Sequence, residues 1–273
     1  DQVVRRDTVL WEKFLRRVLL SALNTAPESA SADLAGAIVR ETFARGGRHM
    51  RPLISSPNLA AAFVDPALER LRRRGADIRL SRSLRAVKFA NGRAVALAFD
   101  GEEECLEPND RVIVAVPPWA AEKLLPGVIA PQTFSAILNA HFQIVPPPQA
   151  CAMIGVIGGT AAWVFAFEDR LSVTVSAADH LMDTESAALA SLLWRDVAAV
   201  HEVAGPVPPC RIVKERRATF AATPAEDARR PTARTEWANV FLAGDWTDTG
   251  LPATIEGALR SGNRAATLAL VAA

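Results

Sequence analysis

One segment near the end of the chain, residues 239–262, constrains the fold more than any other part of the sequence. Its apolar run Val240–Ala243 predicts a short strand, and Ala253–Leu270 predicts a helix. Gly244 and Asp245 stand between the two, where the strand ends. Strands that turn directly into helices are the units of α/β folds, so we expect that fold class.

This strand-to-helix junction has the chemistry to hold a nucleotide-type cofactor. Gly244 has no Cβ, so the backbone can approach a ligand closely, and the Asp245 carboxylate can accept hydrogen bonds from sugar hydroxyls. The helix, whose first turn carries Thr254 and Glu256, adds free amides and a partial positive charge for a pyrophosphate or an electron-rich ring edge. Gly257 would permit close packing. An ordinary turn is the alternative explanation of the Gly-Asp pair taken alone.

Apolar spacing predicts an amphipathic helix at Thr8–Ala22. A second helix is expected to be capped by Ser31 or Asp33, and Asp65–Gly75 is predicted to be a short helix with Pro66 in its first turn and Gly75 as its stop. A long amphipathic helix is predicted at Ala178–Ala204. We place Asp179, Asp183 and Glu185 in the first turns of the last of these helices, where acidic side chains suit the positive end of the dipole.

Strands are predicted in two groups, which implies two sheets. The first group is Asp77–Leu80, Ser83–Phe89, Ala94–Phe99 and Arg111–Val116, with Asn91–Gly92 as a hairpin turn. The second group is Ala150–Ile157, Ala162–Phe167, Leu171–Ser176 and a strand that begins at Ile212. The run Arg111–Val116 is apolar after its first residue, which is typical of a strand buried on both faces of a parallel or mixed sheet. Trp119 then opens a helix that runs to Leu125.

The stretch Leu124–Phe167 contains no Asp, Glu, Lys or Arg. Its length would suit a membrane span, but its prolines and glycines would interrupt a helix, so we expect a buried core or an apolar tunnel wall. The net charge of +1 gives no general attraction to nucleic acid, and we expect no nucleic-acid partner. Local basic clusters remain open; for the arginines at positions 70, 72, 73 and 74, a solvated helix face is favoured over a phosphate patch.

Cysteines and histidines do not form a recognisable metal or disulfide pattern. Cys105, Cys151 and Cys210 are odd in number and far apart, which suits a reducing compartment, and the four histidines are scattered. We therefore expect no metal site. The first seven residues lack an initiator Met and an apolar signal core, which leads us to expect that the natural start lies upstream.

Residues Gly244–Ala258 resemble the C-terminal flavin-binding motif of the flavin amine oxidase and phytoene desaturase superfamily. Further segments are similar to the squalene-associated FAD-dependent desaturases, a family better described as hydroxysqualene dehydroxylases: Leu10–Glu12, Ala22–Thr25, Gly158–Thr160, Trp163–Phe165, Leu171–Val173, Ser176–Asp179 and Lys214–Phe220. The resemblance implies FAD as cofactor, with Asp245 bonding its ribityl or phosphate region. It also implies cofactor contacts at Val87, Gly244, Trp246, Pro252, Ala253, Thr254, Ile255 and Gly257.

The same resemblance implies a function in squalene and hopanoid biosynthesis: reduced FAD delivers a hydride to an allylic carbon of hydroxysqualene as the hydroxyl leaves. An acid must assist that departure; Asp248 is a weak candidate, because an Asx turn explains it as well. The substrate would be a lipophilic isoprenoid, and the enzyme would be cytoplasmic, with peripheral contact to the inner membrane through Trp119 unless that residue packs in the core. A phytoene-type desaturase is the second reading, and a flavin amine oxidase is disfavoured because the chain has no Tyr.

The sequence departs from the family pattern in one respect. Family members begin with a βαβ unit that carries a Gly-x-Gly-x-x-Gly loop, and this sequence has no such segment. We therefore expect a truncated chain that binds FAD poorly alone, or a non-catalytic fragment. The remaining chain is divided by the resemblance into a glutathione-reductase-like FAD-binding half without that unit and a substrate half of mixed sheet and helices. The boundaries are 1–58 (helical part of the substrate domain), 59–130 (FAD-binding domain, middle segment), 131–222 (substrate-binding domain) and 223–273 (FAD-binding domain, C-terminal segment).

Overall fold

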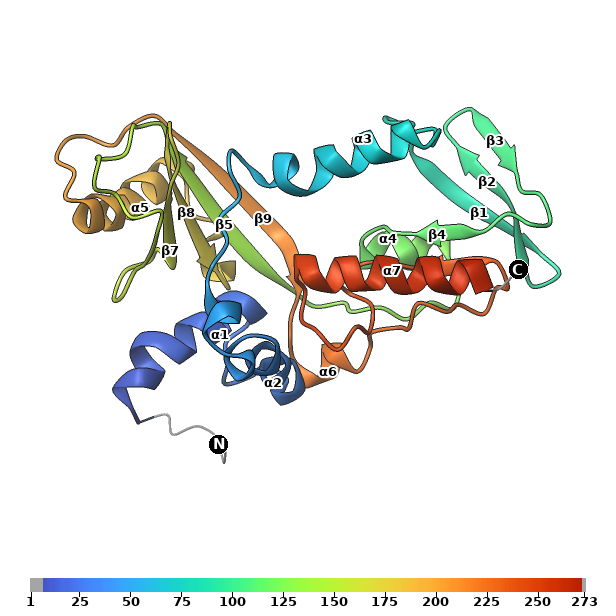
Figure 1. Ribbon diagram of the computed structural model, residues 1–273, viewed down its shortest axis with the longest axis horizontal. Helices are drawn as coiled ribbons and strands as arrows, with labels where there is room; N and C mark the ends of the chain where they lie inside the picture. The colour runs from blue at the N-terminus through green and yellow to red at the C-terminus, as the bar shows by residue number, and fades with distance from the viewer. Residues whose placement is uncertain (1–6, 272–273) are drawn as a thin grey trace. The chain divides into compact units, whose positions relative to one another are not determined.

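The computed structural model describes residues 7–271, so the expectation about a missing signal core at Asp1–Arg6 lies outside the described residues. The chain forms two compact units, each assembled from three separate stretches (Figure 1). The first unit takes the residues up to 29, 42–76 and 134–219; the second takes 30–41, 77–133 and 220–273. These limits differ from the predicted domain boundaries at 30–41, which joins the second unit, and at 59–76, which joins the first.

The first unit is built on a five-stranded sheet in the order β6-β7-β8-β5-β9. Its strands are β5 (Phe134–Phe142), β6 (Met153–Gly155), β7 (Trp163–Ala166), β8 (Leu171–Ser176) and β9 (Cys210–Phe220). Helix α5 (Ser186–His201) lies beside this sheet (Figure 1), and its Leu189, Leu193 and Val197 are fully buried with strand residues such as Phe142 and Val173. The charge-free stretch thus supplies β5, β6 and β7. No helix within residues 7–271 is long and apolar enough to cross a membrane.

Two expectations for this unit were wrong. Strand β5, which is central in the sheet, had not been predicted. The helix expected from residue 178 begins at Ser186, after a short 3-10 turn, η5 (Asp179–Leu181). The reason is that the acidic side chains have other partners: Asp179 accepts from the Ala136 amide at 3.2 Å, and Asp183 pairs with Arg216 at 2.7 Å.

Helical segments complete the first unit. They are the π-helix η1 (Trp11–Leu15) and α1 (Arg16–Leu23), the 3-10 turns η2 (Phe43–Arg45) and η3 (Gly47–Met50), and the π-helix η4 (Ala60–Val64) with α3 (Asp65–Arg73). The helix predicted at 8–22 is confirmed as η1 and α1, and the short helix predicted at 65–75 is confirmed as α3. Helix α1 ends at Asn24, whose buried side chain donates to the Ser135 carbonyl at 3.1 Å and accepts from the Ala177 amide at 2.7 Å. This side chain ties the helix to the sheet.

The second unit contains a small antiparallel sheet, β1 (Leu84–Ala90), β2 (Arg93–Phe99) and β3 (Glu102–Cys105). The predicted hairpin turn is confirmed, with φ of +50° at Asn91 and +72° at Gly92. The strand predicted at Asp77–Leu80 is absent, since this segment is irregular. The buried Asn239 joins this sheet to the rest of the unit, because its side chain bonds both backbone groups of Ala94, at 2.9 and 3.0 Å.

The second sheet of this unit pairs β4 (Val112–Val114) with β10 (Val240–Leu242) in parallel. The helices of this unit are α2 (Ala32–Glu41), α4 (Pro118–Leu124), α6 (Pro224–Asp227) and α7 (Ile255–Val271), of which α7 packs against both strands. The helix predicted from Trp119 is confirmed as α4. Strand β10 is buried at all three residues, whereas Ile113 of β4 is 41% exposed. The expectation that β4 is buried on both faces was therefore wrong within residues 7–271, because the face that carries Ile113 is exposed. In addition, no strand among these residues pairs with the other edge of β4.

Candidate functional site

The turn after β10 requires a glycine. Gly244 has φ of +146°, a region that side chains rarely adopt, and a Cβ built there would lie 2.5 Å from Nε1 of Trp246. Its amide donates to Oγ of Ser261 on α7 at 3.0 Å. The close approach predicted for Gly244 therefore exists, and it is made to the chain's own Trp246.

Three further hydrogen bonds fix this turn. The indole Nε1 of Trp246 donates to the Val116 carbonyl at 2.9 Å, just beyond the end of β4. Oγ1 of Thr247 donates to the Gly244 carbonyl at 2.9 Å and lies 2.7 Å from Oγ of Ser261. Ser261, which was not singled out from the sequence, thus joins the turn to the second turn of α7. No pattern in the sequence marks it.

Asp245 is half-buried within this turn. Burial raises the pKa of its carboxyl group, while hydrogen bonds from the backbone amides of Asp245 and Trp246 and the nearby charge of Arg230 partly oppose that rise. The backbone amides of the turn therefore hold the Asp245 carboxylate at a partly buried position, where burial disfavours the ionised form. A hydroxyl-bearing ligand that donates to it would relieve this penalty.

The N-terminus of α7 lies on the same stretch of chain. Oγ1 of Thr254 accepts from the Gly257 amide at 3.0 Å and so caps the helix. A Cβ on Gly257 would lie 3.1 Å from the Pro252 carbonyl, so this glycine allows the helix to start close to the preceding loop. Within residues 7–271, the amides of Ile255 and Glu256 donate to no backbone carbonyl, and the Ile255 side chain is 48% exposed. These two amides are available to an anion.

The buried side chain of Arg230 stabilises the turn by hydrogen bonds. Nη2 of Arg230 donates to the Thr247 carbonyl, to Oγ1 of Thr249 at 3.2 Å and to the Asp245 carbonyl at 3.4 Å. No pattern in the sequence singled out Arg230. Neighbouring Arg229 has the same chemistry, so only the three-dimensional contacts distinguish them.

Two predicted residues take no part in the side-chain contacts of this turn and helix start. Asp248 belongs to the turn but its side chain is exposed, and it is held through its backbone: its amide donates to the Pro231 carbonyl at 2.8 Å, and its carbonyl accepts from Arg264 at 3.4 Å. Val87 is buried in β1 opposite Leu97 of β2, and β1 forms one edge of its sheet. Asp248 is thus placed to meet solvent or a ligand.

The donor set fits a dinucleotide better than a metal ion. One half-buried carboxylate and two free helix amides match sugar hydroxyls and phosphate oxygens, whereas within residues 7–271 no group of three His, Cys, Asp or Glu side chains could hold a metal. The three cysteines are free thiols. FAD has both a ribityl chain and a pyrophosphate, so the residues present fit it.

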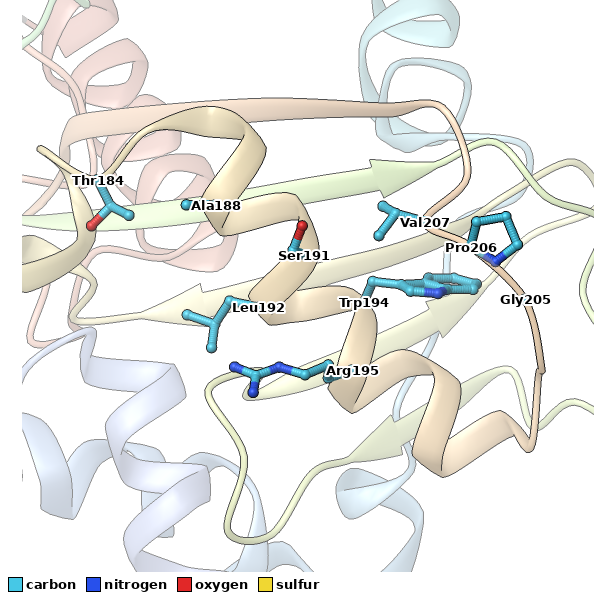
Figure 2. Close-up of a pocket in the computed structure, with 9 residues that line it drawn as sticks. All are labelled: Thr184, Ala188, Ser191, Leu192, Trp194, Arg195, Gly205, Pro206 and Val207. Atoms are coloured by element: carbon cyan, nitrogen blue, oxygen red, sulfur yellow. The ribbon is translucent and has the colours of Figure 1, made fainter.

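The first unit also has a groove of about 660 Å³ along α5 (Figure 2). It is lined by Thr184, Ala188, Ser191, Leu192, Trp194, Arg195, Gly205, Pro206 and Val207, all outside the predicted site. Figure 2 shows the indole of Trp194 beside Pro206 and Val207. Its Nε1 has no partner among the described residues, but it is buried and therefore out of a ligand's reach.

Comparison with known proteins places this geometry in context. The model of a family described as flavin containing amine oxidoreductase matches residues 2–270. Among curated relatives, a hydroxysqualene dehydroxylase of Rhodopseudomonas palustris is 51% identical over 96% of this chain and 63% of its own length. One of Zymomonas mobilis is 44% identical over 98% of this chain and 65% of its own length. The chain thus spans less than two thirds of these relatives, and the resemblance found in the sequence is confirmed.

Solved structures support the same fold. An oxidoreductase from Methanosarcina mazei superposes with a TM-score of 0.72 at 14% identity, covering 93% of this chain and 64% of that one. A redesigned putrescine oxidase superposes with a TM-score of 0.67 at 15% identity, covering 97% and 65%. At such low identity these likenesses describe the fold alone, and they confirm the predicted α/β class.

Proposed function

We propose a cofactor and a reaction for this chain, which belongs to the flavin containing amine oxidoreductase family. It binds FAD at the junction of β10 and α7 and takes part in the reductive dehydroxylation of hydroxysqualene to squalene. The observation that carries the proposal is that relatives 44% to 51% identical over nearly the whole chain are named hydroxysqualene dehydroxylase. The geometry supports the proposal, because the Asp245 carboxylate offers an acceptor and the first amides of α7 offer donors, and hydrogen bonds within the protein already fix the turn and the helix start.

Each residue of the site has a role in this proposal. Asp245 accepts from hydroxyls of the ribityl chain, and the amides of Ile255 and Glu256 donate to a phosphate or the ring edge. Gly244, Trp246, Pro252, Ala253, Thr254 and Gly257 shape the turn that carries these groups, and the backbone of Val87 pairs with adenine. The reduced flavin supplies the hydride. Asp248, being exposed, is the candidate to protonate the departing hydroxyl.

The proposal includes a further strand at the open edge of β4. In a parallel pair, alternate residues bond the neighbouring strand, and Val112 and Val114 bond β10, so the backbone groups of Ile113 face the other edge. The side chain of Ile113 is also exposed. We propose that a Gly-rich βαβ segment, corresponding to the third of the relatives' length outside the match, pairs there and supplies the rest of the FAD site.

The substrate class follows from the same relatives and is a lipophilic isoprenoid alcohol. We place the reaction in the cytoplasm at the inner membrane, from which such a substrate would be drawn. Trp119, half-buried at the start of α4, is the candidate contact. Partition of the protein onto vesicles, measured for Trp119→Ala and the unchanged chain, tests this placement; equal partition would contradict it.

The decisive experiment compares the chain alone with the chain co-expressed with the unmatched segment of the Rhodopseudomonas palustris relative. We expect flavin absorbance in the co-purified pair and, after chemical reduction, conversion of hydroxysqualene to squalene. Desaturation of phytoene or oxidation of putrescine instead would assign the site to the other reactions of the superfamily. A pair that assembles without flavin would support a non-catalytic fragment.

A matched pair of variants tests the strand edge. Ile113→Lys should leave the chain folded but abolish co-purification, because a charge on the docking face opposes strand addition. Val213→Lys changes a similarly exposed strand residue of the first unit and should have no effect. Equal co-purification of both variants would remove β4 from the proposal.

A further inference from the structure

We propose that Arg230 is the positioning residue of the candidate FAD site, because its guanidinium holds the turn from Asp245 to Thr249 in the ligand-ready shape. This inference rests on the proposed function. In that proposal Asp245 and the start of α7 contact the ligand, and Arg230 does not. The role of Arg230 is to fix the positions of these ligand-binding groups.

Burial and contacts separate Arg230 from an ordinary surface arginine. Its side chain is 1% exposed. One nitrogen, Nη2, serves three alternate residues of the turn, namely the carbonyls of Asp245 and Thr247 and the hydroxyl of Thr249. A short loop with several inward carbonyls is otherwise costly to bury, so this donor decides the path of the loop.

The guanidinium is itself oriented by a chain of contacts. Nη1 of Arg230 donates to Oδ1 of Asp227 at 3.0 Å, and Oδ2 of Asp227 accepts from Oγ of Ser31 at 3.0 Å. Ser31 is buried and holds the start of α2, where its amide donates to the Ala222 carbonyl at 2.6 Å. The ring of Phe220 lies 4.9 Å from the guanidinium carbon. A buried arginine fixed on both sides in this way has a single orientation.

Charge gives Arg230 a second effect on the site. The turn carries the half-buried Asp245 carboxylate, and Arg230 is the cation whose charge lowers the pKa of that group against the effect of burial. Removing the guanidinium would favour the protonated form of Asp245, which accepts fewer hydrogen bonds from ligand hydroxyls. Geometry and charge therefore act in the same direction.

The planar fork of arginine explains why lysine would not serve. Lysine keeps the charge, but its single ammonium cannot hold both Asp227 and the turn in the fixed geometry that the two Nη atoms provide. The nearby Arg229 is half-exposed and bonds the Ala130 carbonyl through Nε at 3.0 Å. It is the natural control, since it has the same chemistry one residue away.

The test uses Arg230→Lys, Arg229→Met and the double variant Arg230→Met with Asp227→Leu. The double variant avoids leaving the half-buried Asp227 carboxylate without its cation, which would itself destabilise the fold. Two measurements are made on the chain without cofactor: hydrogen exchange of the amides from 245 to 249, and titration of the Asp245 carboxyl by NMR. Flavin affinity is then measured on the assembled protein.

We expect faster exchange in both Arg230 variants, a higher Asp245 pKa in the double variant only, and flavin binding weakened about tenfold or more. Arg229→Met should change none of these.

Unchanged exchange and titration in the double variant would overturn the role of Arg230 even if flavin binds. If exchange and titration change as expected but the unchanged protein binds no flavin, the proposed function fails and the positioning role stands. An Arg230→Lys protein that matches the original in exchange would overturn the requirement for the fork.

Discussion

The five-stranded sheet of the first unit and the two-stranded parallel sheet of the second unit differ in how complete they are within residues 7–271. The five-stranded sheet of the first unit packs fully buried side chains such as Phe142, Leu138 and Leu193 against one another and against α5. The parallel sheet of the second unit has two strands, and its smaller cluster places Phe241 among alanines. Parallel sheets are normally larger and covered on both faces, so the second sheet has an edge that another strand can complete.

This difference indicates where binding and stability are located. The strand that ends in the Gly244–Asp245 turn belongs to the less complete sheet, and its neighbour β4 exposes Ile113. Ligand sites are drawn from regions of lower local stability, since they must respond to a ligand or partner. We therefore expect core changes in the first unit to affect stability most, and changes at the turn to affect ligand binding as well.

The largest effect is expected from Phe142→Ala. It leaves a cavity in the complete core and should lower the free energy of unfolding by about 3–5 kcal/mol. Hydrogen exchange resolved by segment would show the loss mainly in the first unit. Phe63→Ala, at a residue 47% exposed, should change stability by less than about 1 kcal/mol. Similar losses for both variants would mean that Phe142 does not lie in a tightly packed core.

Gly244→Ala comes next, with an expected loss of about 2–5 kcal/mol from backbone strain and overpacking against Trp246. Faster exchange should appear at the turn and in α7, because Gly244 bonds Ser261 there. Denaturant unfolding followed by the same segment-resolved exchange measures this. An equal loss in the first unit would show that the two units unfold together.

Asp245→Asn should stabilise the chain at neutral pH, on the order of 1 kcal/mol. The folded state raises the pKa of this carboxyl group, so it binds the proton more tightly than the unfolded state. Stability is then fully present below the unfolded pKa, falls as pH rises, and is lost above the raised pKa. Unfolding measured from pH 4 to pH 8 should lose this slope in the variant, whereas Asp248→Asn, at an exposed residue, should keep it. Flavin affinity should fall in Asp245→Asn, which separates binding from stability.

The smallest effect is expected from Gly262→Ala, in the middle of α7. A Cβ there meets nothing within 4 Å, so the variant should gain about 0.5–1 kcal/mol from lower backbone entropy in the unfolded chain. Thermal unfolding would detect this gain. A loss of stability instead would contradict the open space around this position. Weaker co-purification with the further segment, at unchanged stability, would show that this segment docks against α7.

Several elements were predictable because their causes are local. The hairpin at Asn91–Gly92 follows from residues that tolerate positive φ, and α3 from its helical spacing between Pro66 and Gly75. Strand β10, the turn at Gly244 and helix α7 were likewise read from consecutive residues. The roles of the individual site residues toward FAD remain a prediction.

By itself the sequence determined the fold class and the order of strand, turn and helix at the candidate site, because periodicity and turn chemistry act over a few residues. Its resemblance to known sequences indicated the family. Only the tertiary structure decided that Asp179 and Asp183 bond elsewhere, that Ile113 is exposed, and that Arg230 and Ser261 hold the turn. Ser261 lies 17 residues from Gly244, and Ser31 lies 196 residues from Asp227. Contacts over such separations depend on where the folded backbone brings each side chain, and no local pattern records that.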